Sequence, residues 1–130
     1  MRGTFLEIRP GALTANARRA RALANGARVF AMVKANGYGH GLGLAARAFA
    51  NAVDGLGVAV IEEAQALRHL GLAHPVLVAE GFFDADELAL ASRLHAEVVV
   101  HSPWQVDLLA ARPAPLGVWL KVNTGMNRLG

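Results

Sequence analysis

Strand-like and helix-like segments alternate along the whole of this 130-residue sequence. Short apolar runs of buried-strand length are separated by longer segments in which apolar residues recur at helical spacing. Because a series of strand–helix units packs its strands side by side in one direction, this alternation predicts an α/β fold with a parallel sheet. The runs expected to form strands are residues 29–33, 57–60, 75–79, 98–100 and 116–122.

The expected helices begin at recognisable signals. The first starts at Pro10, which suits a first helical position, and ends before Gly26. Asp84 followed by Glu87 has the spacing of a capping box, and Ser102 is expected to cap the last helix. The helices are therefore expected over residues 10–24, 44–53, 61–70, 84–94 and 102–109.

Two architectures fit five parallel strands in a chain of this length. One is a small doubly wound sheet of flavodoxin type, which would be a complete domain. The other is the first part of an eight-stranded (β/α) barrel, which needs about 250 residues in all. Hydrophobic residues make up 54% of the chain and charged residues only 18%. Either the strands are buried on both faces, or part of the surface is covered by something else.

Composition excludes several classes of protein. No stretch approaches the length of apolar sequence that spans a membrane, and the first residues lack the apolar core of a signal peptide. The chain has no cysteine, and its histidines lack the spacing of a zinc helix, so no metal site is expected. The net charge of +3 comes mostly from arginines around one early helix, which does not indicate a nucleic-acid partner. We expect a cytoplasmic protein with no membrane partner.

Lysine is used sparingly, which draws attention to the two lysines present. The chain has eleven arginines but only Lys34 and Lys121. Both lie at or near the end of an expected strand, where active sites of parallel α/β folds form. A lysine that merely solvates a strand end would have the same position.

The segment after Lys34 is rich in glycine. Residues 35–43 contain four glycines and Tyr38, the only tyrosine of the chain. Such a segment either brings backbone amides close to an anion or forms a flexible turn, and the phenol either donates to a phosphate or packs. A strand-end amine beside a phosphate site is what pyridoxal phosphate would need, because its aldehyde forms a Schiff base with lysine.

Two motifs resemble a known family. Residues 31–41, which read AMVKANGYGHG, closely resemble the pyridoxal-phosphate attachment motif of alanine racemases. Residues 120–130, which read LKVNTGMNRLG, resemble a second signature of the same family. The resemblance implies that residues 1–130 are the N-terminal portion of a cofactor-binding (β/α)8 TIM-type barrel, with about five of its eight parallel strands. The remaining strands and a β-rich C-terminal domain are then expected to be absent from the chain.

The resemblance also implies roles for individual residues. Lys34 matches the lysine that forms the internal aldimine with pyridoxal 5'-phosphate and acts as one catalytic base. Tyr38 matches a cofactor-binding tyrosine that bonds the phosphate, and Arg128 matches an arginine near the cofactor oxygen and the substrate carboxylate. Lys121 matches a lysine that is carbamylated in some members, whose carbamate would hold that arginine. Asn123 departs from the aspartate more often found there, which is expected to keep the turn but change its charge.

The activity implied is racemisation of L-alanine to D-alanine by an isomerase that acts as a homodimer and supplies a peptidoglycan precursor. The second base of the family is a tyrosine of the partner subunit's C-terminal domain, and no position here matches it. The isolated chain is therefore expected to be inactive. Two alternatives are a non-catalytic fragment and a barrel protein of pyridoxal-phosphate homeostasis, although proteins of that second kind lack both motifs as written here.

Overall fold

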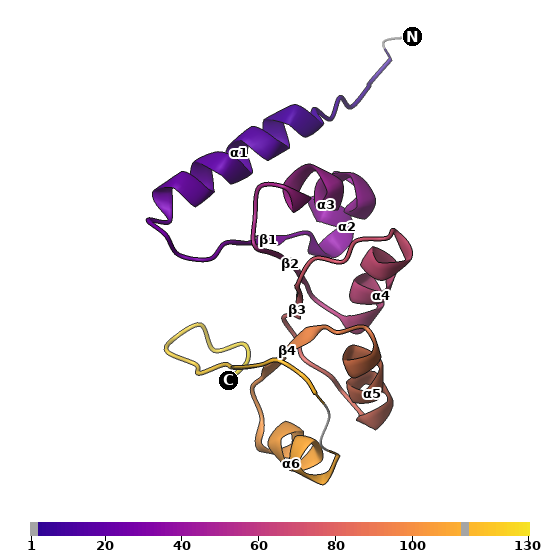
Figure 1. Cartoon of the computed structure of the whole chain (residues 1–130), viewed down its shortest axis with the longest axis vertical. Helices are drawn as coiled ribbons and strands as arrows, with labels where there is room; N and C mark the ends of the chain where they lie inside the picture. Colours follow the sequence, from indigo (N-terminus) through magenta and orange to yellow (C-terminus); the bar gives the residue numbers. More distant parts are fainter. Residues whose placement is uncertain (1–2, 113–114) are drawn as a thin grey trace.

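The computed structural model describes residues 3–112 and 115–130 of the chain. Strands and helices alternate within these residues, as the sequence predicts (Figure 1). In chain order the elements are α1 (Pro10–Leu23), β1 (Phe30–Met32), α2 (Lys34–Tyr38), α3 (Leu42–Ala50), β2 (Gly55–Val58), α4 (Ile61–His69), β3 (Val76–Val78), α5 (Ala85–Arg93), β4 (Glu97–Val100), α6 (Pro103–Ala111) and β5 (Val118–Leu120).

The five strands form one parallel sheet in the order β1-β2-β3-β4-β5. A doubly wound sheet reverses its strand order at a switch point, and this sheet does not. Figure 1 shows α3, α4 and α5 along one side of the strands. The barrel-type arrangement is thus confirmed, and the flavodoxin-type alternative is wrong.

The sheet curls so that its two edge strands approach each other across the concave face. Phe30 of β1 and Trp119 of β5 meet edge to face, with ring centroids 5.6 Å apart at 73°. Two strands at opposite edges of a flat sheet could not make this contact, since neighbouring strands are about 4.8 Å apart. The five strands therefore describe an arc of a barrel.

The core lies between the convex face of the sheet and the helices. Alternate residues of the central strands point into it, as a strand's two-residue period requires, and small or branched side chains of α4 and α5 pack against them. Its fully buried members include Leu56, Val58, Val76, Val78, Val98, Leu67 and Ala91. Strand β5 contrasts with this core, because Val118 is 48% exposed and Leu120 is 75% exposed.

Strand β2 begins two residues earlier than the sequence predicts, at Gly55, and it ends at Val58. Its two glycines face the neighbouring strand β1. A Cβ at Gly55 would overlap the Phe30 ring, and a Cβ at Gly57 would overlap the Met32 sulfur. The glycines thus leave room for the large side chains of β1 on the concave face. A search for apolar runs misses the first residues of this strand because glycine has no apolar side chain.

The predicted cap of α5 by Asp84 is confirmed, although Glu87 bonds the amide of Phe83 and not that of Asp84. The Oδ1 atom of Asp84 accepts hydrogen bonds from the amides of Asp86 at 2.9 Å and Glu87 at 2.8 Å. The Glu87 carboxylate in turn accepts from the Phe83 amide at 2.9 Å. These bonds satisfy amides that would otherwise lack partners at the helix start.

The predicted hydrogen bond from a Ser102 cap is wrong. Ser102 occupies the N-cap position of α6, but its side chain makes no capping bond. The side chain of Gln105 reaches back instead, and its Oε1 atom accepts from the His101 amide at 2.8 Å. Gln105 therefore fixes the residue before the N-cap, and it does not take over the bond that a serine hydroxyl would accept.

Two polar side chains tie the outer layer together. Asp54 accepts from the Val29 amide and from the Arg21 guanidinium, each at 2.8 Å. The amide of Val29 first, and then the charge of Arg21, lower the pKa of the Asp54 carboxyl.

The helices of residues 3–112 and 115–130 include none with the length and apolar character that a membrane span needs.

Arg68 of α4 is the second of these side chains. Its guanidinium donates to the carbonyl oxygens of Leu72, Leu94, His74 and His95, at 2.7 to 3.3 Å. Burial lowers the pKa of Arg68 because it disfavours the charged form. One guanidinium therefore binds the chain after α4 to the chain after α5.

Candidate active site

The carboxyl ends of the strands surround a cavity of about 350 Å³. Lys34 follows β1, Glu80 follows β3, and His101 and Lys121 follow β4 and β5. Arg128 reaches the same cavity from the C-terminal segment. The volume is at the lower end of the range typical of small-molecule sites, about 300–1,000 Å³.

The structure brings together three of the four residues that the sequence singles out. Lys34, Lys121 and Arg128 line this one cavity although they are far apart in the chain. Tyr38 does not line it. It borders a neighbouring cavity of about 510 Å³, between the N-terminal segment and the turn after Lys34, and it is 59% exposed.

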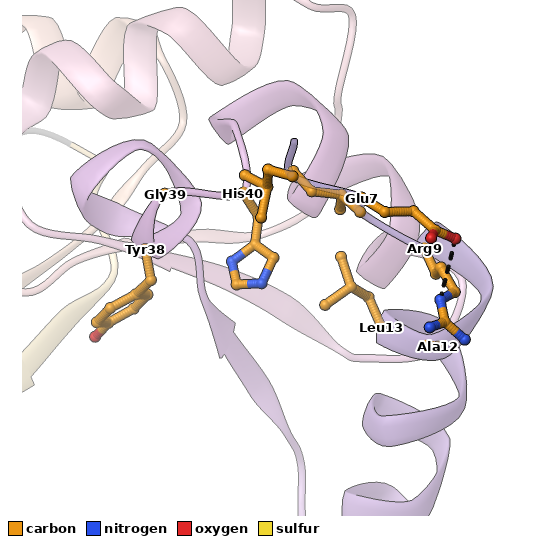
Figure 2. Close-up of a pocket in the computed structure, with 9 residues that line it drawn as sticks. Glu7, Arg9, Ala12, Leu13, Tyr38, Gly39 and His40 are labelled. Atoms are coloured by element: carbon orange, nitrogen blue, oxygen red, sulfur yellow. Dashed lines mark ion pairs between the residues drawn. The ribbon is translucent and has the colours of Figure 1, made fainter. Parts of the chain in front are cut away.

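Figure 2 shows this neighbouring cavity. The side chains of Leu13 and His40 face its middle, and the Tyr38 ring extends away from the Glu7–Arg9 ion pair. That ion pair is long, at 3.3 Å, and both side chains are exposed. Exposed ion pairs contribute little to stability, so this pair does little to hold the wall of the cavity in place.

A left-handed turn follows Lys34 directly. Ala35, Asn36, Gly37 and Tyr38 have φ angles of 51°, 55°, 63° and 53°. Left-handed backbone costs about 1–2 kcal/mol for each residue that carries a Cβ. Only Gly37 is exempt, so the surrounding contacts must hold this turn in place.

Amide groups of the turn donate hydrogen bonds to acceptors within the turn itself. The amides of Gly39 and Gly41 donate to the Asn36 carbonyl at 3.2 and 2.9 Å, and the His40 amide donates to the Gly37 carbonyl at 3.1 Å. The Leu42 amide donates to the Asn36 side-chain oxygen at 2.9 Å. The interpretation of residues 35–43 as an amide cradle for an anion is therefore wrong for these groups, because intramolecular acceptors already occupy them.

Glu80 and His101 line the cavity but were not selected from the sequence. The Nε2 atom of His101 lies 3.1 Å from the Glu80 carbonyl oxygen. A carbonyl oxygen can only accept, so this contact is a hydrogen bond in the tautomer that carries its proton on Nε2, an atom that also lies 3.5 Å from the Gln105 amide nitrogen. Each residue directly follows an expected strand, as an active-site residue of a parallel α/β fold would, but neither residue type is scarce in the chain as lysine is.

A fully buried amide holds this part of the cavity wall. Gln105 is 0% exposed, and its Nε2 group donates to the Phe82 carbonyl at 3.0 Å. Its Oε1 atom accepts from the His101 amide. Gln105 thus fixes the segment after β4 to the segment after β3.

Asn123 organises the turn that carries Arg128 to the cavity. Its Oδ1 atom accepts from the amides of Gly125 and Asn127, both at 3.0 Å. Its Nδ2 group donates to the Asn127 side-chain oxygen at 3.0 Å. The expectation that asparagine keeps the turn is confirmed, and this last bond is one that an aspartate could not donate.

Comparison with known proteins identifies the family of this chain. The sequence profile described as "Alanine racemase, N-terminal domain" matches residues 8–130. This chain belongs to the alanine racemase family.

Individual relatives show how much of such a protein the chain represents. An alanine racemase from Alcanivorax borkumensis is 66% identical over 130 residues, which cover 100% of this chain and 37% of the relative. An alanine racemase from Xylella fastidiosa is 48% identical over 132 residues and is covered over 36% of its length. The structure of alanine racemase from Acinetobacter baumannii superposes with a TM-score of 0.89 at 40% identity, covering 95% of this chain and 38% of that one. The chain thus spans little more than a third of these alanine racemases.

Proposed function

We propose that residues 1–130 form the N-terminal part of the cofactor-binding barrel of an alanine racemase. In this proposal Lys34 binds pyridoxal 5'-phosphate for the interconversion of L-alanine and D-alanine. One observation carries the proposal. Lys34, Lys121 and Arg128 line one cavity at the carboxyl ends of the strands, in a chain that belongs to the alanine racemase family.

The residues of the cavity fit the cofactor. Lys34 supplies a primary amine, the group that combines with an aldehyde. Arg128 supplies positive charge for an anionic oxygen of the cofactor or for the substrate carboxylate. Pyridoxal phosphate, when bound, supplies an electron sink that stabilises negative charge on the α-carbon of the substrate.

The chain's own residues have distinct tasks. In this proposal the Lys34 amine accepts and returns the α-proton on one side of the substrate. The planar guanidinium of Arg128 suits a carboxylate, because two parallel N–H groups fix its orientation. Tyr38, which borders the neighbouring cavity, is proposed to reach the cofactor phosphate from there.

Lys121 and Arg128 present like charges to the same cavity, and like charges repel. We propose that carbon dioxide adds to the Lys121 amine, which forms an N–C bond and releases a proton. The resulting carbamate is an anion and would attract the Arg128 guanidinium. Carbamylation would therefore replace a repulsion by an ion pair that orients Arg128.

The second base and the assembly are also proposals. Tyr38 is the only tyrosine, and it does not line the cavity of Lys34, so no residue here matches the tyrosine expected as the second base. We propose that it comes from a C-terminal domain in a cytoplasmic homodimer whose D-alanine supplies peptidoglycan synthesis. A sequence without cysteine has no disulfide that would require an oxidising compartment.

The test compares the 130-residue chain with a chimera in which it replaces the matching part of the Alcanivorax borkumensis relative. We expect D-alanine formation from L-alanine by the chimera and none by the short chain. Borohydride trapping followed by peptide mass analysis should place the cofactor on Lys34. Lys34→Ala should abolish D-alanine formation and cofactor trapping at position 34. Arg93→Ala, on the exposed side of α5, should change neither the activity nor the trapping.

Two results would contradict the proposal. Turnover by the short chain would show that no second base from outside is needed. Trapped cofactor on Lys34 in a chimera that folds but produces no D-alanine would favour the cofactor-binding protein without turnover.

A further inference from the structure

The carboxylate of Glu63 lies between the ends of two neighbouring strands. Its Oε1 atom accepts a hydrogen bond from the Ala35 amide at 2.7 Å, and its Oε2 atom accepts from the Ala59 amide at 2.8 Å. Ala35 directly follows Lys34, and Ala59 directly follows β2 and lines the cavity of Lys34. One side chain therefore joins the backbone just after Lys34 to the backbone just after β2, the neighbouring strand.

This arrangement requires a carboxylate. Each oxygen serves a different amide, so both acceptors are in use. A glutamine would keep one oxygen but would present an NH2 group to the other amide, and two donors do not bond. Glu63 also lies in the first turn of α4, where the helix dipole favours a negative charge.

The Ala35 amide, which Glu63 binds, belongs to the first residue of the strained turn. Ala35 is the first residue with a left-handed φ, and the other end of the turn is held by the Asn36 side chain on the Leu42 amide. On the strand side, the Val33 amide donates to the Gly57 carbonyl at 2.8 Å. The backbone on both sides of Lys34 is thus fixed, by the sheet before it and by Glu63 after it.

We propose that Glu63 is a positioning residue for Lys34. It holds the left-handed turn against its strain and so fixes the direction in which the amine enters the cavity. The inference rests on the proposed function, since it assigns Lys34 the task of binding the cofactor. Glu63 itself is absent from the cavity wall, so it acts through the backbone of Ala35 and Ala59.

The experiment compares Glu63→Gln with Glu62→Gln. Both substitutions remove one negative charge from the first turn of α4, but Glu62 is exposed and takes no part in these two bonds. Glu63→Asp keeps the charge on a shorter side chain and serves as a second variant. Hydrogen–deuterium exchange of residues 34–41 and the rate of borohydride-trapped cofactor on Lys34 are measured in the 130-residue chain, and kcat and KM for alanine are measured in the chimera.

For Glu63→Gln we expect exchange of residues 34–41 to rise by about tenfold or more, because a bond to a charged group is lost. A displaced amine should lower kcat by about 10- to 100-fold, with KM roughly unchanged and slower trapping at Lys34. Glu63→Asp should recover part of the lost kcat and part of the lost trapping rate. Glu62→Gln should match the parent protein in exchange, trapping and kcat.

The inference is overturned if Glu63→Gln behaves like Glu62→Gln in exchange and trapping. It is also overturned if exchange rises while trapping and kcat stay at the parent values, because the role would then be structural only. A parent chimera without racemase activity would defeat the proposed function instead, and the trapping rates would still decide the role of Glu63.

Discussion

Substituting Gly37 by alanine tests the left-handed turn beside Lys34. Gly37 has a φ of 63°, and a Cβ built on it would lie 2.9 Å from the Cβ of Ala45 in α3. The left-handed backbone would cost about 1–2 kcal/mol. The overlap with a helix that is already packed would add about 1–3 kcal/mol. We therefore expect Gly37→Ala to lower the free energy of unfolding by about 2–5 kcal/mol.

Gly39 provides a matched control in the same turn. Its φ is 86°, yet nothing lies within 4 Å of a Cβ built on it. Gly39→Ala should therefore cost only the backbone term of about 1–2 kcal/mol. Urea unfolding followed by tryptophan fluorescence measures both values in the 130-residue chain, and the difference between them isolates the overlap with Ala45.

A double-mutant cycle completes the experiment. Ala45→Gly removes the methyl group that a new Cβ at Gly37 would meet, although alone it costs about 1 kcal/mol of helix stability. Combined with Gly37→Ala it should recover the overlap energy, so that the two changes together cost less than their sum. The reasoning is refuted if Gly37→Ala is no more destabilising than Gly39→Ala, or if the two changes are simply additive.

Two further predictions concern the outer layer. Arg68→Ala should cost about 2–4 kcal/mol in urea unfolding, because several carbonyl oxygens lose a charged donor; a cost no larger than that of the exposed Arg93→Ala would contradict this. The lowered pKa of Asp54 contributes stability above the ordinary value of 3.8, and this is lost as the pH falls through the folded-state value. Asp54→Asn should therefore flatten the acid side of a stability–pH profile, and an unchanged slope below pH 4 would show that another carboxyl is responsible.

The sequence predicts the number of strands and their approximate positions in the chain, because each strand coincides with a continuous apolar run. It misplaces the start of β2, where Gly55 and Gly57 provide no apolar side chain and are selected by the size of Phe30 and Met32 on the next strand. It also misses the left-handed turn after Lys34. No local preference of alanine favours a φ of 51°, so this conformation depends on contacts with Glu63 and α3 that are distant in the chain.

The candidate site is predictable to the extent that it follows from topology. Parallel strands end at one edge of the sheet, and this places Lys34 and Lys121 at the same cavity. Glu80 and His101 obey the same rule, but their residue types are common at surfaces and carry no separate signal. The role of Gln105 depends on complete burial, which one-dimensional periodicity cannot reveal for a single polar residue.

The order of the strands has a consequence for how the chain is made. Each strand pairs with the one synthesised just before it, as Phe30 with Gly55 and Val98 with Val118. Within these five strands, a newly emerged unit therefore finds its docking edge already formed by the strand before it. Folding can proceed from the N-terminus during translation, one strand and its helix at a time. Lys34 would then be held on the first strand well before Arg128 leaves the ribosome.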